Sequence, residues 1–138
     1  MISPTGLGIR NDPAGQGIWG ASRGERPHMG VDFLCIPGQK IKAPLNMEIY
    51  RRSNPYADNP NYTGIAWRTD IMEGRMFYFA PLGISVGGQV KEGQHIGYAQ
   101  DISDLYFETA MEPHIHFEIK SIDPVVIMEL ITSMQKFN

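Results

Sequence analysis

The chain has 138 residues, with 12 Lys and Arg against 15 Asp and Glu, and a formal net charge of −3. This length can bury one hydrophobic core, so we expect residues 1–138 to form a single domain and a monomer. The negative charge provides no general basic field, which argues against nucleic acid as a partner. No stretch approaches the ~18 apolar residues needed to cross a bilayer, so no membrane span is predicted.

The sequence contains a single cysteine, Cys35. An intramolecular disulfide and a zinc site built from several thiolates are therefore both excluded. Any metal site in this chain must use nitrogen and oxygen ligands. Because Cys35 lies in an apolar run at residues 31–36, we expect a buried, unreactive side chain.

Short strands and turns are predicted along most of the chain, because its 15 Gly and 10 Pro are spread throughout. Residues 11–27 form a Gly-rich loop. Segments rich in β-branched or aromatic residues then predict strands at residues 30–36, 40–43, 47–51, 64–69, 75–80, 95–99 and 114–120. Residues 53–64, with two Asn-Pro pairs, predict a loop long enough to wall a groove.

One helix is predicted near the C-terminus. Asp123 suits an N-cap, Pro124 suits the first helical position, and Val126, Leu130 and Met134 share a face. We expect that face to pack against the sheet. The predicted fold class is therefore mostly β: antiparallel sheets with short hairpins form a groove, and one C-terminal helix closes the structure.

Three of the four histidines fall in two short motifs, His28-Met29-Gly30-Val31-Asp32 and His114-Ile115-His116. Two histidines one residue apart on a strand project from the same face, with Cα atoms about 6.6 Å apart. One of them can bind a metal while the other addresses whatever the metal activates. The earlier motif adds an imidazole and a carboxylate, which completes three ligands for zinc. A fourth position left to water is typical of a catalytic zinc.

Each motif also has a plainer interpretation. His28 and Asp32 would lie ~13 Å apart on a straight strand, so sharing one zinc requires a bend near Gly30. Without a metal, these two would be a loop histidine and a turn carboxylate. His114 and His116 would belong to a solvated sheet face. Glu118, on the same face, would be either an exposed glutamate or an acceptor that orients a ligand imidazole.

Further motifs are Gly8-Ile9-Arg10-Asn11-Asp12-Pro13, Gly38 to Pro44, Ile84 to Gly97 and Pro113-His114-Ile115-His116-Phe117-Glu118-Ile119. Together with the first histidine motif, they resemble in order and spacing the lysostaphin- and LytM-like zinc endopeptidases, which cleave peptidoglycan cross-links. The resemblance covers most of the chain. It implies that His28, Asp32 and His116 bind Zn²⁺ and that His114 is a catalytic histidine.

The sequence departs from this family at Tyr78. The family usually has a second catalytic histidine in a Tyr-x-His-Leu segment, and counting back from Ile84 places Tyr78 there. No histidine occurs between His28 and His95. The Tyr78 phenol could donate a hydrogen bond to a developing oxyanion, or Tyr78 could be a core aromatic and one catalytic group would be missing. Losing one acid–base group typically costs roughly 10²–10⁴-fold in rate.

The resemblance implies a zinc endopeptidase that hydrolyses bonds in peptidoglycan stems or cross-bridges. Short stem peptides with small side chains need a narrow groove, which the 53–64 and 103–112 loops could supply. An alternative is a zinc-retaining, catalytically impaired relative that binds cell wall or activates another hydrolase. A biotinyl or lipoyl carrier domain, suggested by two Gly-rich hairpins, would lack its Met-Lys-Met or Asp-Lys turn and would leave the histidines unexplained.

The expected location follows from the expected substrate. A peptidoglycan hydrolase should be extracellular, periplasmic or facing the cell wall if it is exported. The first residues lack a basic segment followed by an apolar core, so no signal peptide is predicted. A phage-encoded enzyme or a shortened chain would account for this.

Overall fold

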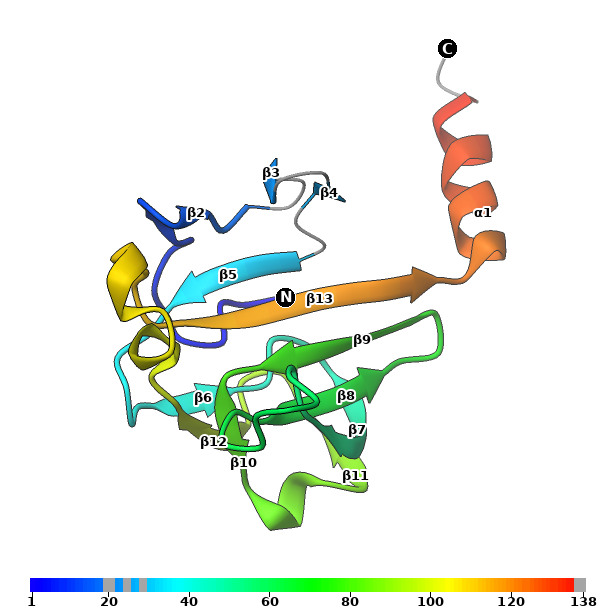
Figure 1. The fold of residues 1–138 in the computed structure, drawn as a ribbon. Coiled ribbons are helices and arrows are strands. Elements are labelled where there is room, and N and C mark those ends of the chain that lie inside the picture. Colours follow the sequence, from blue (N-terminus) through cyan, green and yellow to red (C-terminus); the bar gives the residue numbers. More distant parts are fainter. Residues whose placement is uncertain (19–21, 24–25, 28–29, 136–138) are drawn as a thin grey trace.

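The computed structural model describes residues 1–18, 22–23, 26–27 and 30–135. In these residues the protein is mostly β, with antiparallel pairing between strands and one helix near the C-terminus (Figure 1). The predicted fold class is confirmed in these respects. The groove stays a prediction.

Two sheets enclose the core. The larger has the order β11-β7-β8-β9-β13-β5. In chain order its strands are β5 (Gly30–Leu34), β7 (Met47–Ser53), β8 (Gly64–Arg68), β9 (Met72–Phe77), β11 (Gly88–Val90) and β13 (His114–Ile122). The smaller has the order β10-β12-β6, with β6 (Lys40–Lys42), β10 (Phe79–Pro81) and β12 (His95–Ala99).

Shorter elements lie around these sheets. In the segment expected to be a loop, β1 (Asn11–Asp12) pairs with β2 (Gly15–Gln16), and β3 (Ser22–Arg23) pairs with β4 (Arg26–Pro27). Single 3-10 turns occur at Gly83–Ser85, Ile102–Asp104 and Phe107–Thr109. The predicted loop between β7 and β8 is present. Within the motif at residues 84–97, β11 and β12 belong to different sheets and do not pair with each other.

The side chains of β13 point alternately into the hydrophobic core and toward the candidate site. Ile115 and Phe117 are buried in the hydrophobic core, where Phe117 stacks on Trp67 with ring centroids 5.1 Å apart. Successive side chains of a strand point to opposite faces. His114 and His116 therefore project from the other face of the same strand, away from the apolar cluster.

The segment predicted as one strand at 75–80 bends at Tyr78. β9 ends before this residue, β10 begins after it, and Tyr78 has a φ of 78°. The amides of Tyr78 and Phe79 both donate to the Thr63 carbonyl, at 2.8 and 3.3 Å. The chain thereby passes from the larger sheet to the smaller one. A positive φ in a tyrosine costs about 1–3 kcal/mol, so the surrounding hydrogen bonds must hold it.

The helix begins where the sequence predicts but does not pack as expected. In α1 (Pro124–Gln135), the Asp123 carboxylate accepts a hydrogen bond from the Val125 amide at 2.9 Å. The helix projects beyond the end of β13 (Figure 1), and Val125, Met128 and Met134 are 63%, 60% and 68% exposed. Of the face expected to pack against the sheet, Met134 does not, because the helix starts past the end of β13, and the side chains of Val126 and Leu130 lie outside those that the structure describes. Among the described residues, no helix has the length and apolar character that crossing a membrane requires.

Cys35 is buried at 6% exposure, as predicted. Burial, with a smaller effect of Asp101, raises the pKa of its thiol to about 12. Because the thiolate is the reactive form, the folded protein at pH 8 should react with a thiol reagent at least ~10²-fold more slowly than the denatured chain. Release of the chromophore from DTNB, with and without guanidinium, measures this ratio. Equal rates in the two conditions would contradict the burial.

Candidate metal centre

The pairing of β13 with β5 brings two sequence-distant motifs together. His116 lies directly opposite Asp32, and His114 lies opposite Leu34. Directly opposite residues of an antiparallel pair share a face, with Cβ atoms about 4.5–5.5 Å apart. Strand register alone thus places the Asp32 carboxylate beside the His116 imidazole, although 84 positions separate them in the sequence.

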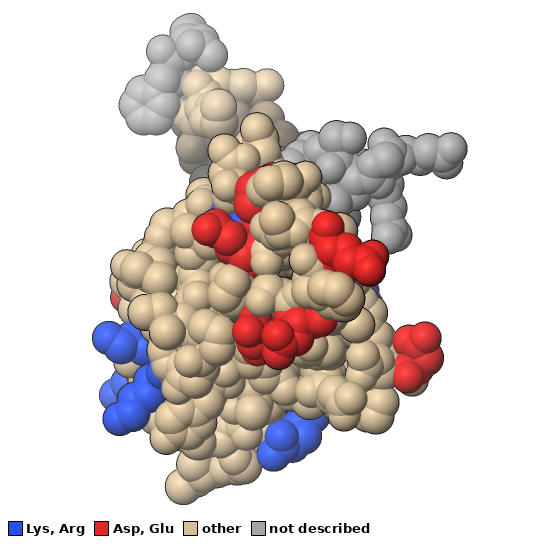
Figure 2. All heavy atoms as spheres, turned by 60° about the vertical axis from the view of Figure 1, so that its left-hand side comes forward, with Lys and Arg blue, Asp and Glu red and all other residues tan. Residues whose placement is uncertain are grey.

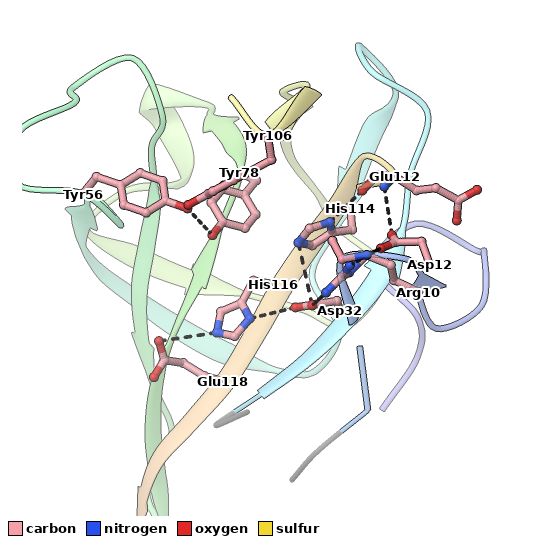
Figure 3. A network of polar contacts seen from close by, with 11 residues as sticks. Arg10, Asp12, Asp32, Tyr56, Tyr78, Tyr106, Glu112, His114, His116 and Glu118 are labelled. Carbon is pink, nitrogen blue, oxygen red and sulfur yellow. Dashed lines mark hydrogen bonds and ion pairs between the residues drawn. The ribbon is translucent and has the colours of Figure 1, made fainter. Parts of the chain in front are cut away.

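His116 is held on both sides by carboxylates (Figure 3). Its Nδ1 lies 2.8 Å from Asp32 Oδ1, and its Nε2 lies 3.6 Å from Glu118 Oε1. Its ring stacks on Phe77 with centroids 6.1 Å apart. Burial lowers the pKa of His116, but its contacts with Asp32 and Glu118 outweigh that effect and raise it. This environment favours positive charge at the imidazole.

The facing pair fits a zinc ion. Two atoms bound to one tetrahedral zinc at about 2.0–2.1 Å lie roughly 3.3 Å apart, so a slight opening of the Asp32–His116 contact would admit the metal. The donors are the nitrogen and oxygen that zinc accepts. Glu118, on the far side of the ring, lies where an acceptor would orient a ligand imidazole.

The third expected ligand, His28, lies outside the described residues. Within the described part of the chain, no three His, Cys, Asp or Glu side chains are grouped so that they could hold a metal ion. The assignment of His28, Asp32 and His116 to zinc therefore stays a prediction.

His114 points its Nε2 toward Asp32. Its Nδ1–H donates to the Glu112 carbonyl at 2.8 Å, and its Nε2 lies 3.7 Å from Asp32 Oδ2. Burial lowers the pKa of His114, so the ring is neutral at pH 7 with its lone pair on Nε2. At 4% exposure for His114 and 8% for Glu118, this face of β13 is not the solvated surface of the plainer interpretation.

Tyr78 lies on the same side as the two histidines. Its ring meets that of His114 edge to face, with centroids 5.3 Å apart. Its hydroxyl lies 3.0 Å from that of Tyr56, which lies 2.8 Å from that of Tyr106. Burial raises the pKa of Tyr78 to about 12, so the phenol keeps its proton at neutral pH. Tyr78 also packs against the core cluster, and both interpretations of this residue stay open.

Arg10 links Asp32 to the N-terminal segment. It is 2% exposed, and its Nε and Nη2 donate to Asp32 Oδ2 at 3.3 and 3.2 Å. Its Nη1 donates to Asp12 Oδ1 at 2.7 Å. Arg10 therefore occupies one oxygen of Asp32, while the other oxygen, Oδ1, faces His116.

Sequence reasoning assigned no role to Arg10, Asp12, Tyr56 or Tyr106. Arg10 and Asp12 lie inside the motif at residues 8–13, and their spacing of two on an extended segment is a signal that they share a face. The tyrosines gave no comparable signal, since Tyr56 is 22 positions from Tyr78 and 50 from Tyr106.

A carboxylate and an imidazole that face each other, beside a second histidine on a two-sheet β fold, define a candidate metallohydrolase centre. The model of peptidase family M23 matches residues 26–126, and the chain belongs to this family, which confirms the lysostaphin- and LytM-like resemblance. The chain is also 30% identical over 119 residues to leukocyte cell-derived chemotaxin-2 of Bos taurus and of Mus musculus. Each alignment covers 85% of this chain and 76% of the relative.

Gly30 tests the packing of the centre. A Cβ at this position would lie 2.5 Å from the Phe117 carbonyl oxygen and 2.7 Å from His116 Cε1. Gly30→Ala should therefore displace β13 and the imidazole, lowering stability by about 1–3 kcal/mol and reducing zinc content. Gly88→Ala is the matched control, since a Cβ there meets nothing within 4 Å. Thermal melting and elemental analysis measure both effects, and a Gly30→Ala protein identical to wild type would refute this packing.

Proposed function

We propose that this protein is a zinc-dependent endopeptidase that hydrolyses peptide bonds in bacterial peptidoglycan stems or cross-bridges. Membership of family M23 supports a metallopeptidase. The observation that carries the proposal is the Asp32–His116 pair with the free nitrogen of His114 turned toward it. A purely structural metal site would have no use for that second, non-ligating histidine.

Each residue then has a separate part in the chemistry. Bound through His28, Asp32 and His116, zinc would lower the pKa of a water to about 7 and polarise the scissile carbonyl. His114 Nε2 would accept the proton of the attacking water, because its Nδ1 is already committed to the Glu112 carbonyl. The neutral Tyr78 phenol would donate a hydrogen bond to the developing oxyanion.

A peptide partner suits the surroundings of the centre. The β7–β8 loop contributes Tyr56 and the β12–β13 connection contributes Tyr106, and a hydrogen bond joins their hydroxyls. The β12–β13 connection carries Asp104, Glu108 and Glu112 exposed, without Lys or Arg. Figure 2 shows acidic side chains across the middle of the face on this side and basic ones at its left and lower edges. This charge would repel the phosphates of nucleic acid.

The substrate also implies a location. A peptidoglycan hydrolase acts outside the cytoplasmic membrane, in the periplasm or at the cell wall, or is encoded by a phage. We further propose that the protein works as a monomer.

The second candidate is a zinc-retaining relative with impaired chemistry that binds cell wall or activates a hydrolase. Two observations favour it. Tyr78 stands where the family usually has a histidine, and the curated relatives are named as a chemotaxin, not as a hydrolase. Turnover of defined cross-linked muropeptides by the purified protein, read beside its zinc content, separates the two candidates.

The roles of the paired histidines can be separated by contrasting variants. His116→Ala should lose zinc, because two remaining ligands hold the metal poorly. His114→Ala should keep near-stoichiometric zinc while muropeptide hydrolysis falls by roughly 10²-fold or more. Elemental analysis and single-substrate turnover measure these outcomes. Loss of zinc from His114→Ala, or its retention in His116→Ala, would mean that the two roles are misassigned.

Tyr78 distinguishes an enzyme from an impaired relative. If its phenol stabilises the oxyanion, Tyr78→Phe should lower kcat with little change in KM, by about 2–4 kcal/mol of transition-state stabilisation. If the wild type is active and Tyr78→Phe has the same kcat, Tyr78 is a packing residue and does not donate to the oxyanion. If the wild type cleaves nothing, Tyr78→His restores the family's usual residue, and gained muropeptide cleavage would identify an impaired site.

A further inference from the structure

The backbone of Glu112 connects the N-terminal segment to His114. Its N–H donates to Asp12 Oδ2 at 2.9 Å, and its carbonyl accepts the Nδ1–H of His114 at 2.8 Å. Figure 3 shows these contacts side by side above Asp32. Glu112 precedes β13, whose first paired residue is His114. Among the described residues, the pairing of β13 with β5 begins after Glu112, with the Cys35 amide donating to the Pro113 carbonyl at 3.1 Å, and the Asp12 carboxylate is the group that holds the Glu112 N–H.

The two carboxylate oxygens of Asp12 have different hydrogen-bond partners. Oδ1 accepts from Arg10 Nη1 at 2.7 Å and from the Ala14 amide at 2.9 Å, whereas Oδ2 accepts from Glu112. The side chain is 3% exposed. Burial raises the pKa of Asp12, but these donors together outweigh burial and lower it, so all of its acceptor positions are available at neutral pH.

Asp12 therefore stands between the two halves of the site. Through Arg10 it is linked to the carboxylate of Asp32, and through Glu112 it is linked to the imidazole of His114. An Asp12 that merely capped the turn between β1 and β2 would need its bond to Ala14 alone. The bond to Glu112, 100 positions away, serves no such cap.

We propose that Asp12 is a positioning residue: by holding the Glu112 N–H, it fixes the backbone at Glu112 so that the Glu112 carbonyl keeps His114 in the Nδ1–H form with Nε2 facing Asp32. The consequence for turnover rests on the proposed function. The consequence for the protonated nitrogen of His114 does not, and it can be measured in a protein that cleaves nothing.

Asp12→Asn is the sharpest variant. The amide oxygen of the new side chain can accept hydrogen bonds from both Arg10 and Ala14, as Oδ1 does in the wild type. Its amide nitrogen then faces the Glu112 N–H and cannot accept a hydrogen bond from it. The Arg10–Asp32 contact survives while the Glu112 contact is lost. Glu48→Gln is the matched control, since Glu48 also accepts from an arginine, Arg68 at 2.7 and 3.2 Å, in β7 away from the centre.

Long-range ¹⁵N–¹H NMR of the imidazoles reads the protonated nitrogen directly. The chain has four histidines, and His114→Ala identifies the signal. We expect His114 to be protonated on Nδ1 in wild type and Glu48→Gln, and to become a mixture of both forms in Asp12→Asn. Zinc content should stay unchanged, and kcat should fall roughly 10–100-fold at nearly constant KM. An unchanged His114 signal in folded Asp12→Asn would overturn the proposal.

A second measurement needs no variant. The Glu112 amide of the wild type should exchange slowly with deuterium, since a buried carboxylate holds it. Exchange as fast as in an open loop would overturn the proposal even if Asp12→Asn failed to fold. If the His114 form changes in Asp12→Asn while the wild type shows no muropeptide turnover, the positioning stands and the proposed hydrolysis fails.

Discussion

The register between β13 and β5 is the constraint on which the candidate centre depends. Because side chains alternate along a strand, a slip of one residue would turn His116 into the core and bring Ile115 to the site. Ile115 and Phe117 are buried among apolar side chains, so such a slip would expose them. The same packing that stabilises the sheet therefore aligns His116 with Asp32.

Burying Asp32 imposes a second requirement, which the N-terminal segment meets. Asp32 is 2% exposed, and a buried carboxylate is tolerated only when it is paired and hydrogen-bonded. Arg10 provides two donors to it, and the backbone of Asp32 is also bound, donating to the Gly17 carbonyl and accepting from the Arg10 amide. Asp12 then balances the guanidinium. With two carboxylates around one arginine, the cluster favours an additional positive charge, in line with the raised pKa of His116 beside Asp32.

Sequence reasoning succeeded where the signal was local. Alternation around His114 and His116 predicted a strand with both rings on one face, and Asp123 predicted the start of the helix. It failed where the answer depended on distant neighbours. An apolar helix face does not reveal whether a sheet lies close enough to pack against, and α1 begins beyond the end of β13. The bend at Tyr78 depends on the Thr63 carbonyl, which no pattern around residues 75–80 could indicate.

The hydrogen bonds that link the hydroxyls of Tyr78, Tyr56 and Tyr106 can run in either of two directions, and the direction bears on the chemistry. Each phenol has one proton, so Tyr78 can donate to a substrate oxygen only if it accepts from Tyr56, which must in turn accept from Tyr106. The opposite order would leave Tyr78 as an acceptor toward the site, and an acceptor repels an oxyanion. Donation from Tyr56 lowers the pKa of Tyr78, although burial outweighs it. Tyr56 and Tyr106 thus determine whether the phenol at this position can replace a histidine as a hydrogen-bond donor.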